Sequence, residues 1–391
     1  MRYKINMQKS YLTNNYTPLG IKFSYGSGCY LFDKSGNKYL DALSGVGVNI
    51  LGHSHPQIVA TIKSQAEKLI HTSNWYEIEN QEILAEKLCK LSGMQKVFFG
   101  NSGAEANEAS IKASRLFAVQ KNISNPIIIT ANKSFHGRTM ATLSATGNSK
   151  VQNGFSPLVA DFIYVDFNNI EQIQSLSNNK NIVAIMLEPI LGESGVIIPD
   201  NNYLFEVRKI CDTNDWLMIL DEVQTGIGRT GKMFAFEYAD IIPDILTLAK
   251  GLGGGVPIGA TLFNNKTKDL FTAGTHGSTF GGNPLVCAVA NTVLGVIEDD
   301  KILENVVKMS KYLLNSIKSI KTNRIIEVRI KGLMIGIEVD KNPEKLLNMA
   351  LDNKLLLNIT GNTIRFLPPL ILNKSEADII TQVLEKLINS L

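Results

Sequence analysis

The chain has 391 residues, which is enough for a large apolar core and predicts two domains. Its 39 lysines and arginines nearly balance its 36 aspartates and glutamates, so the composition argues against nucleic acid or a membrane surface as a partner. Polar residues follow the first methionine, the apolar runs are too short to span a bilayer, and four separated cysteines form no C-x-x-C pair. We therefore expect a cytoplasmic α/β protein with reduced thiols and no bound metal.

The N-terminal segment is predicted to form a hairpin and then a helix. Residues 26–40 read as two strands around a Lys-Ser-Gly-Asn turn at 34–37. His53 and His55 lie two residues apart and could bind a metal, but no third ligand follows at a suitable spacing. The favoured interpretation is an ordinary loop before a helix over about 57–70.

A strand, a tight turn and a helix start are predicted over 97–108. Ser102 and Glu105 have the spacing of a capping box. The backbone N–H groups of Gly103 and Ala104 would lie at the helix N-terminus, where they can bind a phosphate. The two interpretations are compatible, because a capped helix start still presents its amides.

The region from about 95 to 260 alternates apolar strands, loops and helical stretches. Strands are predicted at 126–130 and 182–188, and each runs into a loop, 134–139 and 189–195. This alternation is typical of a doubly wound or related three-layer sheet.

Two further apolar runs in this region each end in one ionisable residue. The run 216–220 precedes Asp221 and the run 245–249 precedes Lys250, so Asp221 is expected at the carboxyl end of a buried strand, where ligands collect. The apolar approach favours the neutral, nucleophilic amine of Lys250, and the glycines that follow leave room for a bulky group. A buried carboxylate and an activated lysine together indicate pyridoxal phosphate chemistry.

One motif offers a different function. Residues 226–232 (G-I-G-R-T-G-K) satisfy both G-x-G-x-x-G and G-x-x-x-x-G-K and follow a strand, so a nucleotide-binding protein is the alternative. A phosphate-binding loop of that type needs Ser or Thr after its lysine, where this chain has Met233. It also needs a helix at once, whereas 233–238 is aromatic and irregular, so we disfavour this alternative.

The C-terminal third is predicted to hold helices and a few strands. A glycine-rich loop over 274–284 ends in Pro284, which suits the first turn of a helix. The helical pattern continues to about 319, with a break near 299–300, and leads toward a second domain. Strands are predicted at 325–328 and 333–339, the segment 363–370 follows, and an amphipathic helix closes the chain.

With these pieces in order, the chain resembles the class III pyridoxal phosphate aminotransferases over nearly its whole length. The motifs that carry the resemblance are N-Y-x-P-L at 15–19, L-G-H-S-H-P at 51–56, H-T-S-N-W-Y at 71–76, N-S-G-A-E-A-N-E at 101–108, F-H-G-R-T at 135–139, D-E-V-Q-T-G-x-G-R-T-G at 221–231, A-K-G-L-G-G-G at 249–255, S-T-F-G-G-N-P at 278–284 and R-F-L-P-P-L at 365–370. The H-T-S-N-W-Y segment makes it look most like the branch that uses N-acetylornithine, with the ornithine aminotransferases as close relatives.

The resemblance implies fold type I, a three-layer α/β/α large domain joined to a smaller α+β domain. It predicts an N-terminal arm at 1–45 that contributes to the small domain. A large domain that binds pyridoxal phosphate would follow at 46–285, and a C-terminal small domain at 286–391.

The resemblance also assigns residues to pyridoxal phosphate. Lys250 would hold it as a Schiff base and move a proton, and Asp221 would keep its ring nitrogen protonated. The amides of Gly103 and Ala104 would bind the phosphate, and Thr279 would reach the phosphate of the partner subunit in a homodimer with shared active sites. The remaining predicted contacts are Phe135 and Val223 on the two faces of the ring, His136 beside it, Gln224 on the phenolic oxygen, and Glu222.

The implied reaction moves the distal amino group of N-acetylornithine to 2-oxoglutarate. Arg138 would bind the carboxylate far from the reacting carbon, and Arg365 the carboxylate beside it in the second half-reaction. Glu193 would neutralise Arg365 while the donor is bound, unless the two form a plain ion pair. Tyr16 and Ser278 would line the donor pocket. The alternative donors are ornithine, succinyl-diaminopimelate and 4-aminobutyrate.

Three positions depart from the family pattern. Leu191 stands in place of a glutamine near Glu193, and Ala104 stands in place of a threonine at the phosphate. Trp75 stands in place of an aliphatic residue. These changes bear on local hydrogen bonding and on the shape of the pocket, and none of them touches the predicted lysine and aspartate of the centre.

Overall fold

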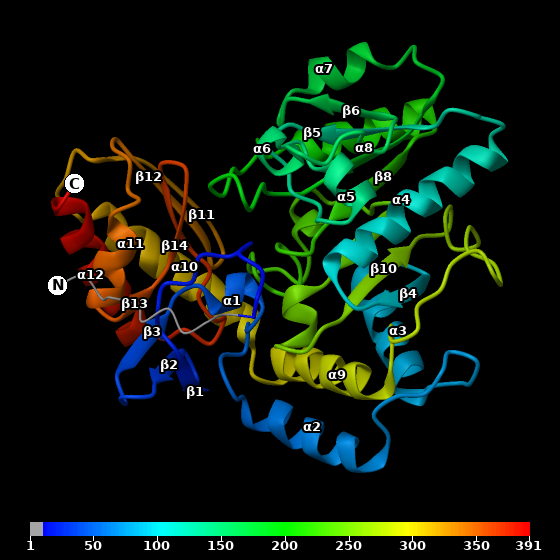
Figure 1. Ribbon diagram of the computed structural model, residues 1–391. Coiled ribbons are helices and arrows are strands. Elements are labelled where there is room, and N and C mark those ends of the chain that lie inside the picture. Colours follow the sequence, from blue (N-terminus) through cyan, green and yellow to red (C-terminus); the bar gives the residue numbers. More distant parts are fainter. Residues whose placement is uncertain (1–10) are drawn as a thin grey trace.

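The structure is a computed structural model that describes residues 11–391 (Figure 1). Its centre is a seven-stranded sheet with the strand order β4-β10-β9-β8-β7-β5-β6. The strands are β4 (Lys96–Gly100), β5 (Ile127–Ala131), β6 (Phe162–Val165), β7 (Ile182–Leu187), β8 (Leu217–Asp221), β9 (Ile245–Leu248) and β10 (Gly259–Phe263). The neighbours from β9 to β6 are parallel, whereas β10 runs antiparallel to both β9 and β4.

Five of these strands confirm the predictions from apolar runs, within one or two residues. The other two, β6 and β10, were not predicted. The short strand β6 lies at the sheet edge and is mostly half-buried, so its sequence lacks the signal of a fully buried strand. Strand β10 begins at a glycine directly after a glycine-rich turn, which masks its start in the sequence.

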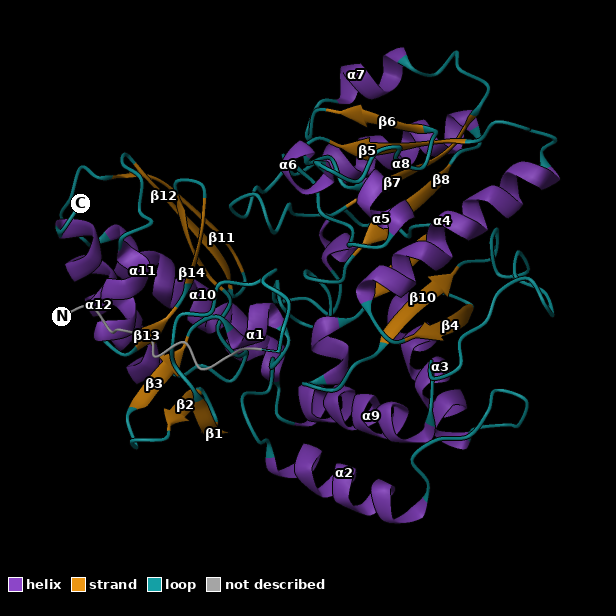
Figure 2. Cartoon of the chain, in the orientation of Figure 1, coloured by secondary structure: helices purple, strands orange, loops and turns teal. Residues whose placement is uncertain are grey.

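The central strands bury both of their faces. In β7 and β8, Ile185 and Leu220 join an apolar cluster with residues of α3, α8 and α9, whereas Met186 and Ile219 join a second cluster with residues of α4. Helices therefore cover both faces, and the expected three-layer α/β/α arrangement is confirmed (Figure 2). The helices around this sheet are α3 (Glu79–Ser92), α4 (Gly103–Gln120), α5 (Met140–Ala145), α6 (Ser149–Gln152), α7 (Ile170–Ser175), α8 (Tyr203–Asn214) and α9 (Pro284–Asp299).

Two smaller sheets lie beside the large one (Figure 1). An antiparallel sheet has the order β11-β12-β15-β14, and an N-terminal sheet has the order β1-β2-β3-β13, in which β3 pairs with β13 from the C-terminal third. Their strands are β1 (Phe23–Ser27), β2 (Tyr30–Asp33), β3 (Lys38–Asp41), β11 (Ile325–Lys331), β12 (Met334–Val339), β13 (Leu355–Leu356), β14 (Asn358–Thr360) and β15 (Thr363–Phe366). The remaining helices are α1 (Ser44–Gly47), α2 (Pro56–Lys68), α10 (Ile302–Lys318), α11 (Leu346–Asp352), α12 (Lys374–Asn389) and the 3-10 turns η1 (Ala235–Tyr238) and η2 (Lys250–Gly253).

Local signals in this part of the chain are also confirmed. Asn283 caps α9, Pro284 is its first residue, and the break predicted near 299–300 separates α9 from α10. Strand β15 covers the first part of the 363–370 segment and ends at Phe366, because a proline pair follows and cannot donate to a sheet.

The boundaries of the domains stay predictions. The boundary placed after residue 285 falls inside α9, and this helix packs against α2, α3 and η2. Within residues 11–391, no helix combines the length and the apolar character that crossing a bilayer requires.

Candidate active site

Asp221 and Lys250 meet because their strands are neighbours. Strand β8 ends at Asp221, every residue of β8 is buried, and Asp221 lies opposite Thr247 of the parallel strand β9. Lys250 follows three residues later at the start of η2, with a left-handed backbone φ of +41°. Such a φ is uncommon for a residue with a side chain and is often found where the backbone is held for function. Both side chains thus lie at the carboxyl edge of the sheet, where parallel sheets bind ligands.

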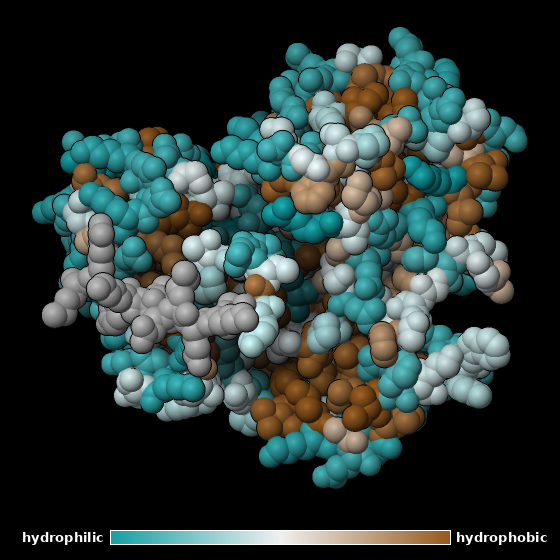
Figure 3. Space-filling view, in the orientation of Figure 1, coloured by the Kyte–Doolittle hydropathy of each residue, from teal (hydrophilic) through white to brown (hydrophobic). Residues whose placement is uncertain are grey.

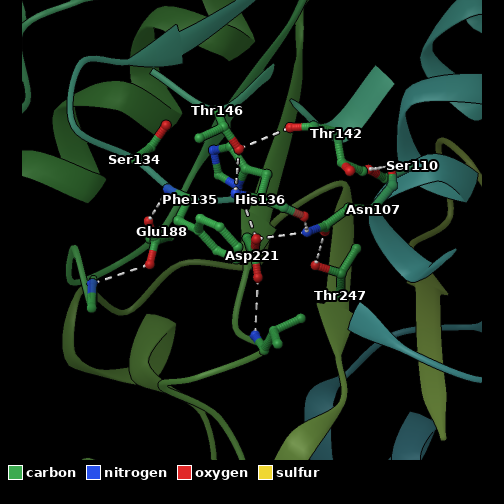
Figure 4. Close-up of polar contacts among 12 residues, drawn as sticks. Asn107, Ser110, Ser134, Phe135, His136, Thr142, Thr146, Glu188, Asp221 and Thr247 are labelled. Carbon is green, nitrogen blue, oxygen red and sulfur yellow. Dashed lines mark hydrogen bonds and ion pairs between the residues drawn. The ribbon is translucent and has the colours of Figure 1, made fainter. Parts of the chain in front are cut away.

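Three groups hold the Asp221 carboxylate in place (Figure 4). Asn107 Nδ2 donates to Oδ2 at 2.7 Å, His136 Nδ1 lies 2.8 Å from the same oxygen, and the Val223 N–H donates to Oδ1 at 3.1 Å. Asn107 is fixed in turn by Thr247, whose hydroxyl donates to Oδ1 at 2.7 Å. Asn107 has a place in the N-S-G-A-E-A-N-E motif, but no role was predicted for it.

The environment of Lys250 favours its neutral amine. Burial lowers the pKa of the ammonium below its ordinary value, and the carboxylates of Glu193, Asp221 and Glu188 only partly oppose this shift. The expectation drawn from the apolar run before Lys250 is therefore confirmed. A larger fraction of this side chain is a nucleophile at neutral pH than for an exposed lysine.

The start of α4 has the geometry of an anion site. Ser102 Oγ accepts a hydrogen bond from the Glu105 N–H at 3.1 Å, so the predicted cap is present, and the first-turn N–H groups of Gly103 and Ala104 have no intrahelical acceptor. A Cβ atom at Gly103 would lie 2.7 Å from Val223 Cγ1. Glycine is therefore required at this position for Val223 to pack against the helix start.

A buried glutamate that was not predicted ties two loops of the site together. Glu188, just after β7, accepts hydrogen bonds from the Phe135 N–H at 2.9 Å and the Gly192 N–H at 3.1 Å (Figure 4). Burial raises the pKa of this carboxyl to about 7. The sequence signal is an acidic residue at the end of an apolar run, the same signal that marked Asp221.

We expect Glu188→Gln to make the stability of the protein less dependent on pH. A carboxyl whose pKa rises from 4.5 unfolded to about 7 folded binds more protons in the native state, so the unfolding free energy falls as the pH rises through this window. The variant loses one hydrogen-bond acceptor at every pH. Because its amide does not titrate, its unfolding free energy falls by up to about 3 kcal/mol less between pH 4.5 and 7 than that of the wild type. Urea unfolding at a series of pH values measures this slope, and an unchanged slope would contradict the prediction.

Arg365 and Glu193 form a two-pronged ion pair. Arg365 on β15 is completely buried, and its Nη1 and Nη2 lie 2.8 Å and 3.2 Å from the two carboxylate oxygens of Glu193. Burial by itself raises the pKa of Glu193, but Arg365, together with Lys250 and Gln224, more than offsets this, and the pKa is lowered. Gln224 Nε2 also donates to Glu193 at 3.2 Å, so three of the predicted site residues are brought together.

Glu222 points away from this cluster. Its carboxylate accepts hydrogen bonds from the N–H groups of Ala235 and Phe236 at 2.7 Å and 2.8 Å, and burial raises its pKa to about 7. Its carboxylate oxygens hold the 233–238 segment, and within residues 11–391 its side chain forms no hydrogen bond or ion pair with Asp221 or Lys250. The glycine-rich loop before this segment leads into the 3-10 turn η1 and not into the α-helix that a nucleotide site needs.

The other predicted substrate residues lie on the surface of the single chain. Arg138 is exposed, with its guanidinium carbon 5.5 Å from the centre of the Phe135 ring, and Tyr16 is 82% exposed. Ser278 and Thr279 line a cavity of about 540 Å³ together with residues 71 and 73–75. Neither Lys250 nor Asp221 lines this cavity. Within residues 11–391 of a single chain, the cavity at Ser278 and Thr279 is therefore separate from the Lys250–Asp221 centre.

These residues fit pyridoxal phosphate. The site offers a nucleophilic amine, a buried acid, an anion-binding helix start and an aromatic ring. Two buried polar atoms, His136 Nε2 and Gln224 Oε1, have no hydrogen-bond partner within residues 11–391. Such atoms are costly unless another molecule satisfies them.

Comparisons with known proteins find relatives along nearly the whole chain. The family model of the class III aminotransferases matches residues 11–388. The acetylornithine aminotransferase of Nitrosomonas europaea is 47% identical over 379 residues, which cover 96% of each chain.

Two solved structures extend the comparison. The acetylornithine aminotransferase of Elizabethkingia anophelis has a TM-score of 0.86 and 36% identity, and covers 97% of this chain and 96% of its own. An ornithine aminotransferase of Toxoplasma gondii, with partial occupancy of pyridoxal phosphate at its active site, has a TM-score of 0.94 and 33% identity over 97% of this chain and 92% of its own. The chain therefore belongs to the class III aminotransferases and is a pyridoxal phosphate-dependent enzyme.

Proposed function

We propose that this enzyme transfers the distal amino group of N-acetylornithine to 2-oxoglutarate. The products are the acetylated glutamate semialdehyde and glutamate, which places the reaction in arginine biosynthesis. The similarity to acetylornithine aminotransferases at 47% identity supports the donor. The observation that carries the proposal is the Arg365–Glu193 pair, because a buried cation that can be neutralised or released suits a site that accepts a donor and then a dicarboxylate in turn.

The chain supplies the binding and the proton transfer. When bound, pyridoxal phosphate supplies an aromatic ring that withdraws electrons from the reacting carbon of the substrate. Lys250 would hold the cofactor and then carry the proton at that carbon, for which its lowered pKa prepares it. Asp221 would pair with the ring nitrogen, and its fixed oxygens need no reorganisation to do so.

The rest of the cofactor would lie in the pocket around this pair. Gly103 and Ala104 would bind the phosphate through their N–H groups, as the free first turn of α4 allows. Phe135 and Val223 would contact the two faces of the ring. His136 and Gln224 would lie at its edge, where His136 Nε2 and Gln224 Oε1 lack a partner within residues 11–391.

The substrate carboxylates would be read by two arginines. Arg138, which is exposed beside Phe135, would bind the carboxylate far from the chemistry. Arg365 would stay neutralised by Glu193 during the donor half-reaction and bind the near carboxylate of 2-oxoglutarate in the second. Tyr16 and Ser278 would complete the donor pocket.

Thr279 would reach the phosphate of the second subunit in a cytoplasmic homodimer. Exposed aromatic side chains support an interface near this residue: Trp75, Tyr76 and Phe280 are 92%, 69% and 59% exposed. Hydrophobic side chains also gather over α9 on the face drawn in Figure 3. Apolar surface of this kind marks sites of association.

We expect Arg365→Lys to damage the 2-oxoglutarate half-reaction more than the donor half-reaction. An ammonium cannot reproduce the two parallel hydrogen bonds of a guanidinium to a carboxylate, so kcat/KM for 2-oxoglutarate should fall by about 10- to 100-fold. Single-turnover rates of the two half-reactions, followed separately by absorbance, measure the difference. Equal losses in the two would favour the alternative that Arg365 and Glu193 form a plain structural ion pair.

Steady-state rates with four donors test the proposed donor. N-acetylornithine should give the highest kcat/KM, ahead of ornithine, succinyl-diaminopimelate and 4-aminobutyrate, with 2-oxoglutarate as the acceptor. Faster turnover of free ornithine would overturn the donor but leave the aminotransferase assignment intact. Pyruvate, which has no distal carboxylate, as the better acceptor would overturn the role proposed for Arg138.

A further inference from the structure

The loop that carries Glu193 adopts a conformation that needs external support. This loop, residues 188–197, is called the Glu193 loop below; Leu191 and Ile197 close it through two backbone hydrogen bonds of 3.1 Å. Val196 in this loop is completely buried and has a φ of +58°. A β-branched residue avoids this region of backbone space, so contacts elsewhere must hold the loop in place.

The second sheet provides a row of residues that fits this loop. Arg329 of β11 lies opposite Gly336 of β12, and Gly336 lies opposite Arg365 of β15. Residues opposite one another in antiparallel strands point to the same face, so two arginines flank a position without a side chain. A Cβ atom at Gly336 would lie 2.6 Å from the Gly195 carbonyl oxygen. The backbone of the Glu193 loop therefore occupies the space above the glycine.

The two arginines bind this loop on both sides of the glycine. Arg365 Nη1 donates to the Gly192 carbonyl oxygen at 2.6 Å, in addition to its ion pair with Glu193. Arg329 Nε donates to the Gly195 carbonyl oxygen at 3.0 Å, and Arg329 Nη2 donates to Thr363 Oγ1 at 3.1 Å. The loop is thus fixed on each side of Glu193 by one guanidinium.

Arg329 can perform this task because its own charge is balanced. Its Nη1 lies 2.6 Å from Glu338 Oε2 and also contacts Glu327, and the arginine is only 8% exposed. Charge-assisted pairs of this kind hold a guanidinium in one orientation. The predicted site residues do not include Arg329 or Gly336, and neither contacts Lys250 or Asp221 among the residues that the structure describes.

We propose that Arg329 and Gly336 are positioning residues that keep Glu193 on Arg365, an inference that rests on the proposed roles of Glu193 and Arg365. We call the contacts of Arg329 and Gly336 with the Glu193 loop the clamp. The clamp holds the loop in place before the Glu193–Arg365 pair forms, so forming this pair costs little conformational entropy. When the clamp is lost, the Arg365 charge is less completely neutralised. That charge repels a donor that arrives as an ammonium and still attracts the carboxylate of 2-oxoglutarate.

The variant Arg329→Met tests the clamp, because it keeps an unbranched side chain as far as the Nε position and removes every donor. We expect kcat/KM for the donor to fall about tenfold, the effect of one lost hydrogen bond to a charged group, while kcat/KM for 2-oxoglutarate stays within about twofold. Gly336→Ala, which displaces the loop by steric contact, should shift the ratio of the two constants in the same direction. Equal losses in both half-reactions, or an unchanged ratio, would overturn the proposal.

Arg324→Met is the matched control. Arg324 lies next to the same strand and forms one exposed ion pair with Asp340, at 3.1 Å, without touching the Glu193 loop. The control should leave the ratio of the two kcat/KM values unchanged. The same shift in Arg324→Met as in Arg329→Met would show that charge removal near this sheet is enough, which would overturn the clamp.

Hydrogen exchange separates the clamp from the proposed function. The amides of Leu191 and Ile197, which are hydrogen-bonded to each other's carbonyl oxygens, should exchange about tenfold faster in Arg329→Met than in wild type or Arg324→Met. This measurement needs no turnover, so it stays valid if N-acetylornithine is not the amino donor. Unchanged exchange in Arg329→Met would overturn the clamp even in an enzyme that uses N-acetylornithine.

Discussion

Replacing Lys250 with alanine should abolish transamination. The amine is the group that would hold the cofactor and move the proton at the reacting carbon, and proton transfer by a positioned side chain alone contributes about 10²- to 10⁴-fold. We expect kcat to fall by at least this factor. Borohydride treatment should attach the cofactor irreversibly to wild type and leave none on the variant, as measured by mass spectrometry.

Lys232→Ala is the control for this prediction. Lys232 is also partly buried and lies in the glycine-rich loop, where its ammonium donates to the Glu237 carbonyl oxygen at 2.9 Å. This variant should keep both the turnover and the borohydride adduct. Irreversible attachment of the cofactor to Lys250→Ala would refute the role assigned to Lys250. Lost activity in Lys232→Ala would indicate that the glycine-rich loop at 226–232 has a function of its own.

Replacing Asp221 with asparagine should have the second largest effect. The amide nearly preserves the shape of the side chain but carries no charge to pair with a protonated ring nitrogen. Removing a fixed electrostatic contact of this kind costs about 10²- to 10³-fold in kcat. Single-turnover rates with a saturating donor give the loss, and the absorption spectrum of the bound cofactor should shift as its ring nitrogen loses the proton.

Asp244→Asn separates this effect from the general cost of altering a buried carboxylate. Asp221 and Asp244 are both 4% exposed, but Asp244 binds the Met218 N–H at 2.8 Å and Arg208 at 2.7 Å, away from the site residues. Asp244→Asn should lower the melting temperature and leave kcat and the cofactor spectrum of the folded enzyme unchanged. A loss of kcat as large as that of Asp221→Asn would contradict a special role for Asp221.

Patterns that extend over a few neighbouring residues were predictable from the sequence. The apolar runs that end at Asp221 and Lys250 define buried strands, and the ends of such strands share one edge of the sheet whatever the details of packing. The cap at Ser102 and the first turn of α9 at Pro284 depend on equally local rules. The family motifs added the Arg365–Glu193 pair, which no local pattern contains.

The partners of each buried polar group depended on the tertiary structure. Asn107 and Asp221 are 114 residues apart in the chain and meet only because α4 packs beside β8 and β9. Glu222, next to Asp221 in sequence, turns to the opposite side and binds the 235–236 backbone.

What the amino-acid sequence determined by itself is five of the seven strands of the large sheet, the capped helix start and the two reactive groups at the edge of the sheet. The tertiary structure decided which donor meets which acceptor, as in the row of Arg329, Gly336 and Arg365. The physical reason is that an apolar run specifies burial, whereas a hydrogen bond between distant residues requires a strand order and a register accurate to one residue.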